Sequence, residues 1–463
     1  MNSSSKVMHW KKLLSARRLG VRTADTVTMG RSPFQQDFDR IVFASAFRRL
    51  GDKTQVFPLP SSDYVRNRLT HSLEAASVGR SLGGIAGAHI CENSDVGSIQ
   101  PSDIGAIVAA AALAHDIGNP PLGHCGEDAI ADWFANSPVA INTRLMMDEW
   151  ECADIARYEG NAQGFRVLAR LEAPEKNGGL QLTCATLGAF AKYPQASLCE
   201  QKPDGASGKK FNFFKADSTL FAEVADATGL LAAGGEGDMA WCRHPLAFLV
   251  EAADDLTYRI VDFEDGHRLG IIPYAELEEL FLAIISDNRI REQLAAAEND
   301  FRRTEILRAR AIGKLVRECV RAFEKYHDDI MHGALAQPLI ELIPSAGIME
   351  EIFSRSLDRI YTDIRAAEVG AAGFELANGL LDAFVATVND VARAANCKGT
   401  PAARSRKLIN LLPATCRRTD DPLWCSNAYV RLIAILDHIT SMTDHHAVSL
   451  YKKIKGISIA SNL

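Results

Sequence analysis

Residues 109–127 read AAAALAHDIGNPPLGHCGE, and this stretch decides the fold of the chain. Alanine is the strongest helix former, so the run before His115 predicts a helix. Gly118 and the two prolines after it then end that helix and turn the chain. His115 and Asp116 therefore stand together at a helix end, where a cavity can open. Imidazole nitrogen and carboxylate oxygen suit a divalent metal, but a His-Asp pair alone is more often only a capped helix end.

Two further stretches supply side chains of the same kind. Residues 66–80 (RNRLTHSLEAASVGR) have a helical pattern with a histidine near its start, and residues 251–260 (EAADDLTYRI) carry a central aspartate. The order along the chain is histidine, then histidine-aspartate, then aspartate, with long gaps between them. We expect the helices to bring together a set of metal ligands: His71, His115, Asp116 and Asp254.

This order resembles the metal-binding signature of the HD-domain phosphohydrolases. Its surroundings, together with residues 159–166 (EGNAQGFR), resemble the deoxyguanosinetriphosphate triphosphohydrolase family more specifically. The resemblance covers roughly residues 31–270 well and the remainder thinly. It implies an all-α fold, with an HD-domain helical core and an additional C-terminal helical layer.

Helical patterns also lie upstream of the metal ligands and between them. Residues 31–50 have apolar side chains at helical intervals, with Ser32 as the expected cap and Pro33 in the first turn. Residues 180–193 again have a helical pattern. Residues 194–210 are rich in polar residues, glycine and proline, which predicts an exposed loop.

The helical pattern continues beyond Asp262. Long amphipathic runs cover residues 274–285, 289–323, 348–364 and 376–395. The sequence shows no alternation of strands with helices and no glycine-rich phosphate loop. We expect one large helical domain in three parts: an adaptable N-terminal arm at 1–30, the HD-domain catalytic core at 31–270 and a C-terminal helical region at 271–463 packed on that core.

Composition limits the class of protein. The 463 residues are 47% hydrophobic, enough for a sizeable core, and the net charge of -7 gives no general reason to expect nucleic acid binding. The 10 cysteines form no Cys-x-x-Cys pair, which argues against a zinc knuckle and against a disulfide framework. No signal core and no membrane-length apolar run is present, so we expect a cytoplasmic protein without a membrane partner.

A divalent metal on these ligands would make bound water more acidic and a phosphate more electrophilic. The mixed nitrogen and oxygen donors point first to Mn2+ or Mg2+, with iron, cobalt, nickel and zinc as alternatives. The resemblance implies hydrolysis of a deoxynucleoside triphosphate at its α-phosphorus, giving a deoxynucleoside and tripolyphosphate.

The resemblance also implies a catalytic pair, His124 and Glu127. Their spacing of three residues places both side chains on one helical face, where a carboxylate can orient an imidazole. We expect His124 to donate the proton to the leaving 5′ oxygen, the alternative being a histidine that only caps its helix. Asn119 departs from some relatives that carry a second histidine there, and an amide cannot carry a proton in turnover.

Several side chains are expected to bind substrate. Arg68 matches a phosphate-contacting arginine, although a salt bridge at the helix start is the alternative. The resemblance places Tyr258 against the sugar, and Asp262 with Gln55 at the 3′ hydroxyl. Lys210 belongs either to a phosphate contact or to a solvated loop. The full substrate-binding set is Gln55, Arg68, Asn119, Tyr258, Asp262 and Lys210.

Family members are commonly oligomeric, often hexameric, and several respond to nucleotides or single-stranded DNA. The resemblance therefore implies a homo-oligomer with such regulation, while the preferred base stays open. The segment around His445 and His446 also keeps no assigned role. Two rival functions remain: an HD phosphohydrolase of another nucleotide, such as a 5′-nucleotidase or phosphodiesterase, and a non-catalytic nucleotide sensor.

Overall fold

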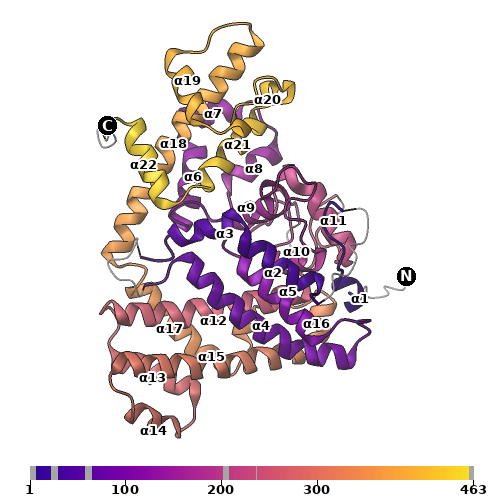
Figure 1. The fold of residues 1–463 in the computed structure, drawn as a ribbon, viewed down its shortest axis with the longest axis vertical. Coiled ribbons are helices and arrows are strands. Elements are labelled where there is room, and N and C mark those ends of the chain that lie inside the picture. Colours follow the sequence, from indigo (N-terminus) through magenta and orange to yellow (C-terminus); the bar gives the residue numbers. More distant parts are fainter. Residues whose placement is uncertain (1–6, 22–29, 58–64, 202–207, 236, 458–463) are drawn as a thin grey trace.

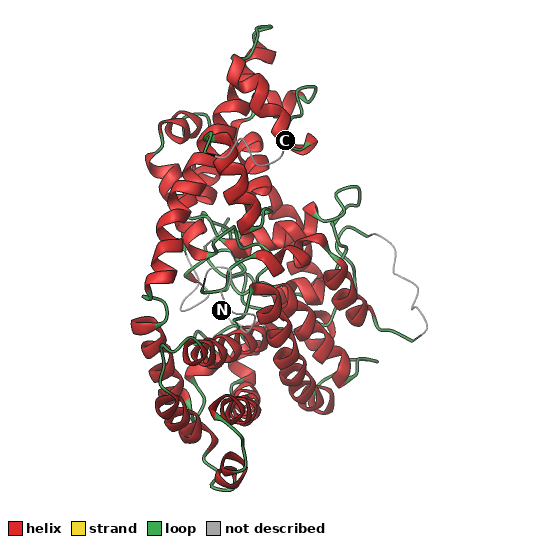
Figure 2. Ribbon diagram, turned by 60° about the vertical axis from the view of Figure 1, so that its left-hand side comes forward, coloured by secondary structure: helices red, strands yellow, loops and turns green. Residues whose placement is uncertain are grey.

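The computed structural model describes residues 7–21, 30–57, 65–201, 208–235 and 237–457. Over these ranges the chain forms helices joined by loops, with isolated bridge pairs and no strand (Figure 2). The predicted all-α fold is confirmed. Figure 1 shows an elongated molecule with one group of helices at each end of its long axis.

The larger group is built around α4 (Arg68–Asn93), α5 (Pro101–Ala114) and α12 (Pro245–Arg268). Small residues let α4 and α5 approach closely, since a Cβ added at Gly83 would lie only 2.8 Å from the side chain of Val108. The alanine run of α5 is buried throughout, so its apolar surface is covered on all sides by neighbouring helices. This close packing fixes the helix ends that carry the metal ligands.

The other helices of this group share the same apolar core. They are α1 (Trp10–Leu13), α2 (Pro33–Phe43), α3 (Ser45–Arg49), α9 (Gly160–Arg166), α10 (Cys184–Phe190), α11 (Ser218–Thr228), α13 (Tyr274–Ile285), α14 (Ile290–Ala295), α15 (Asp300–Lys325), α16 (His327–Met331) and α17 (Ala346–Arg359). In Figure 1, α13, α14 and α15 lie at the lower end.

A second apolar core lies at the upper end of Figure 1. Its helices are α6 (His124–Asn136), α7 (Pro138–Arg144), α8 (Glu149–Ala156), α18 (Ile364–Asn396), α20 (Pro422–Ser426), α21 (Ala428–Thr440) and α22 (Asp444–Ile454), and α19 (Ala403–Leu408) packs on α18. Early and late parts of the chain thus share this core. The three-part division of the chain stays a prediction.

The described part of the expected N-terminal arm packs on the larger group. Trp10 and Leu13 are buried, and the Met8 backbone N–H donates to the Met331 carbonyl at 2.9 Å. Residues 7–21 therefore contribute apolar surface to the core, and residues 1–6 and 22–29 lie outside the described residues.

Local signals explain most helix boundaries. Ser32 caps α2 and Pro33 stands in its first turn, as predicted. The run predicted over 289–323 is instead broken between α14 and α15, because Asn299 accepts the Arg302 backbone N–H at 2.9 Å and starts a new helix. The helical stretch predicted over 180–193 is shorter than expected, since the Thr183 side chain caps α10.

Helix α18 is, among the described residues, the one helix long and apolar enough to cross a membrane by length and composition. It packs along α6 and α21 and contributes Leu380, Leu381 and Phe384 to the second core. These residues of α18 therefore pack as part of an apolar core.

Candidate active site

The predicted metal ligands lie where the start of α4 and the end of α5 meet the middle of α12. His71 lies in the first turn of α4, His115 and Asp116 follow the last residue of α5, and Asp254 lies in the middle of α12. The imidazole rings of His71 and His115 stand edge to face with centroids 5.1 Å apart. The close approach of α4 and α5 therefore delivers both rings to one point.

Asp254 lies at the centre of this group. Its Oδ1 is 3.2 Å from Nε2 of His71 and 3.3 Å from Nε2 of His115. Ligand atoms of these three residues lie within 4.8 Å of one another, close enough to share one ion. Asp116 adjoins them, with Oδ1 at 3.5 Å from Nε2 of His115.

The donor atoms suit a bound cation. His115 Nδ1 lies 2.7 Å from the Ala112 carbonyl oxygen, and this hydrogen bond assigns the proton to Nδ1 and leaves the Nε2 lone pair for a metal. Among the residues that the structure describes, Asp116 Oδ2 is buried without a hydrogen-bond partner, and a metal would satisfy it. Two imidazoles and two carboxylates fit a divalent ion.

A buried cation accompanies each carboxylate. Arg68 Nη1 donates to Asp116 Oδ1 at 2.9 Å, and Lys192 Nζ donates to Asp254 Oδ2. Burial raises the pKa of Asp116, but Arg68 and the two imidazoles outweigh burial and hold that pKa at about 2. The pKa of Asp254 lies well below its ordinary value because His115 and Lys192 outweigh burial in the same way. Both carboxylates are therefore ionised and able to ligate a metal.

The predicted catalytic pair is assembled at the start of α6. His124 Nδ1 lies 2.7 Å from Glu127 Oε2, and Glu127 Oε1 accepts the Gly160 backbone N–H at 2.6 Å. The His124 side chain is 77% exposed and that of Glu127 only 9%, so a buried carboxylate orients an accessible ring. The hydrogen bond to Glu127 raises the pKa of His124, which favours a protonated ring.

The predicted metal ligands and His124 line one cleft of about 570 Å³. Gln55, Arg68 and Tyr258, which are predicted to bind substrate, line it too. Asn119 lies just beneath, where its Nδ2 donates to Asp116 Oδ1 at 2.7 Å. The amide therefore holds a metal ligand in place.

Tyr361 also lines the cleft, although no sequence motif predicts it there. Its ring stacks on Tyr258 with centroids 5.7 Å apart and planes 9° apart, and its hydroxyl donates to Asp262 Oδ2 at 2.9 Å. Asp262 is buried behind Tyr361 and shares a separate small hollow with Gln55. Burial raises the pKa of Asp262 well above its ordinary value. Of the three residues predicted to contact the sugar, Gln55 and Tyr258 line the cleft, whereas Asp262 does not.

Lys210 stands at the edge of the catalytic pair. Its Nζ lies 2.9 Å from Glu159 Oε2, and the Lys210 side chain is one-third exposed. Burial raises the pKa of Glu159 to about 7, while the Lys210 charge opposes that rise. Burial raises the pKa of Glu127, but the hydrogen bond and charge of His124, together with the charge of Lys210, outweigh burial and hold that pKa below its ordinary value. Lys210 thus favours the ionised form of the carboxylate that orients His124.

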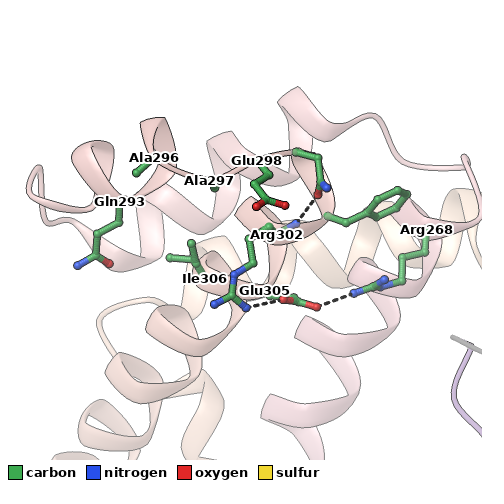
Figure 3. Close-up of a pocket in the computed structure, with 10 residues that line it drawn as sticks. Arg268, Gln293, Ala296, Ala297, Glu298, Arg302, Glu305 and Ile306 are labelled. Carbon is green, nitrogen blue, oxygen red and sulfur yellow. Dashed lines mark hydrogen bonds and ion pairs between the residues drawn. The ribbon is translucent and has the colours of Figure 1, made fainter.

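A larger hollow of about 790 Å³ lies elsewhere, between α14, α15 and the end of α12 (Figure 3). Its arginines are already paired: Arg302 lies 2.7 Å and Arg268 3.7 Å from carboxylate oxygens of Glu305. Within the described residues, the histidine and carboxylate group that can hold a metal lies in the smaller cleft instead. The smaller cleft is therefore the candidate active site.

Comparison with known proteins gives the family. No family model matches the chain. A deoxyguanosinetriphosphate triphosphohydrolase-like protein of Synechocystis sp. is 41% identical over 458 residues, covering 98% of this chain and 100% of that relative. The chain belongs to the deoxyguanosinetriphosphate triphosphohydrolase-like family. A relative of the same name from Pseudomonas aeruginosa is 38% identical over 463 residues, covering 98% of this chain and all of that protein.

A more distant relative carries the enzyme's name outright. The deoxyguanosinetriphosphate triphosphohydrolase of Cronobacter sakazakii is 27% identical over 490 residues, covering 92% of this chain and 94% of that protein. Membership of the triphosphohydrolase-like family agrees with a cleft that joins a metal-binding group to an imidazole–carboxylate pair. Lys192 is the residue of this centre that motif reading missed, because it lies between the motif segments in a stretch with no signal of its own.

Proposed function

We propose that this chain hydrolyses deoxynucleoside triphosphates in a metal-dependent reaction, giving a deoxynucleoside and tripolyphosphate. One observation supports this more than any other: the His124–Glu127 pair and the His71, His115 and Asp254 group open onto one cleft. The names of the relatives indicate the same class of reaction. The deoxynucleotide substrate and the residue roles below are proposals.

The metal would be held by His71, His115, Asp116 and Asp254, with Mn2+ or Mg2+ as the first expectation. When bound, such an ion supplies Lewis-acid activation of water and of a phosphate oxygen. Arg68 and Lys192 already balance Asp116 and Asp254, so these two carboxylates do not present uncompensated negative charge to a polyphosphate. This balance favours an anionic substrate.

Arg68 is proposed to bind the phosphates directly. Its Nη1 holds Asp116, while its Nε is buried without a hydrogen-bond partner in the part of the chain that the structure describes. A guanidinium presents its donors in a fixed fork, so Nε is left for a phosphate oxygen beside the metal ligands. Lys210 would reach a phosphate by leaving its ion pair with Glu159.

His124 is proposed as the proton donor to the leaving 5′ oxygen. Glu127 holds Nδ1, so Nε2 is the nitrogen left to deliver the proton. The Asn119 side chain donates to Asp116 through its Nδ2, so we propose that Asn119 holds this metal ligand in place at a position beside the substrate. On this proposal the imidazole of His124 alone transfers the proton.

The sugar is proposed to lie against Tyr258, whose ring is held from behind by Tyr361. A flat aromatic face leaves little room for a 2′ hydroxyl and offers it no partner, which favours deoxyribose. Gln55 Oε1 is buried without a hydrogen-bond partner within the described residues, so it can accept from the 3′ hydroxyl. Asp262 would support this contact through Tyr361.

The wider setting follows the family resemblance. We propose a cytoplasmic homo-oligomer, with a hexamer among the assemblies to test, regulated by nucleotides or single-stranded DNA. The arm at 1–30, the catalytic core at 31–270 and the C-terminal region at 271–463 are proposed as its parts.

Product analysis tests the proposal. Purified protein with Mn2+ or Mg2+ is incubated with each of the four deoxynucleoside triphosphates and their ribonucleotide counterparts, and the products are separated by anion exchange. The control is the double variant His115→Ala with Asp116→Ala. Tripolyphosphate and deoxynucleoside from the intact protein alone support the proposal, and the rates rank the bases. Orthophosphate or pyrophosphate indicates a different phosphohydrolase, and saturable binding without turnover indicates a sensor.

A further inference from the structure

The turn that carries His124 into the cleft has an unfavourable backbone. Leu122 has φ 63° and Gly123 φ 60°, so a leucine adopts the left-handed conformation that a side chain disfavours. A Cβ at Gly123 would lie 2.2 Å from Arg68 Nη2, so any other residue there would displace that guanidinium. Such a turn persists only where its surroundings hold it, so its outside contacts matter.

Those contacts come from the far end of the chain. Asp444, the first residue of α22, accepts the Leu122 backbone N–H at 3.0 Å with Oδ1 and the Thr54 backbone N–H at 2.8 Å with Oδ2. Its residue surface is 3% exposed, so water does not compete for these bonds. One carboxylate therefore ties the turn before His124 to the loop before Gln55.

A second contact runs alongside. The buried Lys53 ammonium donates to the Asn119 carbonyl at 2.5 Å and to the Thr440 carbonyl, at the end of α21, at 2.8 Å. Lys53 and Asp444 thus each connect the same two loops to the junction between α21 and α22. Burial lowers the pKa of Lys53, and the negative charge of the nearby Asp444 carboxylate opposes this fall.

Packing alone does not hold these loops from behind. Thr54 and Leu122 form a wall between the cleft and a second hollow of about 440 Å³, which is lined by side chains of α18 and α22. Because open space adjoins both faces of the wall, hydrogen bonds add to the partial packing of Leu122 on the second apolar core in setting its position. Asp444 lies on the hollow side and supplies two of them.

We propose that Asp444 is a positioning residue of the active site, which sets the places of His124 and Gln55 by holding the backbones of Leu122 and Thr54. The segment around His445 and His446 thereby acquires a role through its neighbour. His445 itself forms an exposed ion pair, Nδ1 to Asp52 Oδ1 at 2.6 Å, outside the buried contacts. The catalytic part of this inference rests on the proposed function, whereas the structural part does not.

The test combines hydrogen exchange with kinetics. Asp444→Asn keeps the size of the side chain but turns one acceptor into an N–H2 donor, which cannot accept from a backbone amide. We expect exchange at the Leu122 and Thr54 amides to rise at least about tenfold, with α4 and α12 unchanged. The kcat should fall roughly ten- to a hundredfold while Mn2+ affinity, read by electron paramagnetic resonance, stays within about twofold.

A double-mutant cycle separates positioning from general stability. If Asp444 acts through His124, the double variant Asp444→Asn with His124→Ala has nearly the kcat of His124→Ala alone. His445→Ala, the matched control in the same helical turn, should retain kcat within about twofold, because exposed ion pairs contribute little. Lys53→Met perturbs the same two loops independently if Asp444→Asn does not fold.

Unchanged protection of both amides would overturn the inference, and so would fully additive effects in the cycle. If no deoxynucleoside triphosphate turns over with the unaltered protein, the proposed function fails. The exchange measurement still decides whether Asp444 holds the two loops.

Discussion

Replacing Gly160 by alanine tests how closely the catalytic pair is packed. A Cβ at Gly160 would lie 2.6 Å from Glu127 Oε1 and 3.1 Å from Asn119 Oδ1. Ordinary van der Waals contact begins at 3.4 Å, so the carboxylate must retreat by about 0.8 Å. It cannot do so and keep both its hydrogen bonds, to the Gly160 N–H at 2.6 Å and to His124 at 2.7 Å.

The expected loss of kcat follows from the hydrogen bond that Glu127 would lose. A hydrogen bond to a charged group contributes about 1.5–3 kcal/mol. Because about 1.4 kcal/mol corresponds to a factor of ten in rate, we expect Gly160→Ala to lower kcat roughly ten- to a hundredfold. Metal affinity should change less than kcat, because Gly160 begins α9 and affects the predicted ligand Asp116 indirectly, through the Asn119 amide that holds it.

Steady-state kinetics of tripolyphosphate release and a Mn2+ titration measure the two effects. The matched control is Gly84→Ala in α4, where an added Cβ meets nothing within 4 Å and where alanine should stabilise the helix by about 0.5–1 kcal/mol. A Gly160→Ala protein with full kcat would refute the assignment of Glu127 as the carboxylate that orients His124.

Three further predictions concern protonation, packing and the metal. Glu127→Gln should move the alkaline limb of the kcat profile to lower pH, because Glu127 raises the pKa of His124 and a proton donor is lost as pH rises through its pKa. An unmoved limb in a pH series would contradict this. Tyr361→Phe leaves the buried Asp262 without its hydroxyl partner and should lower the free energy of unfolding by about 1–3 kcal/mol, measured by urea denaturation, with Leu357→Ala on the exposed side of α17 as a milder control. Removing the metal with a chelator should abolish turnover and lower the melting temperature, with both restored by Mn2+; a chelator-treated protein with full activity would exclude a metal role.

Much of the centre could be predicted because its residues stand in motifs. The metal ligands are found in order along the sequence, and the structure brings His71, His115 and Asp254 to one point. His124 and Glu127 are close in sequence, so helical spacing alone predicts their contact. Contacts between residues that are close in sequence can therefore be predicted without knowledge of the fold.

Contacts between distant segments could not be predicted in the same way. Tyr361 meets Asp262 across 99 residues, and Asp444 meets Thr54 across 390, with no local pattern that couples them. Asp262 shares a helix face with Asp254, but eight residues of helix separate them by about 12 Å, which moves Asp262 out of the cleft and behind Tyr361. Helical periodicity predicts on which face of a helix a side chain lies, but it does not predict which residues of other segments cover that side chain.

Hydrolysis in water labelled with oxygen-18 tests the proposed reaction most directly. Attack of water at the α-phosphorus breaks the bond to the 5′ oxygen, so mass spectrometry should find one labelled oxygen in tripolyphosphate and none in the deoxynucleoside. Label in the deoxynucleoside would mean attack at the 5′ carbon, and labelled orthophosphate or pyrophosphate would mean cleavage elsewhere in the triphosphate. Either result would contradict the proposed reaction at the α-phosphorus and the role of His124 as the proton donor to the 5′ oxygen.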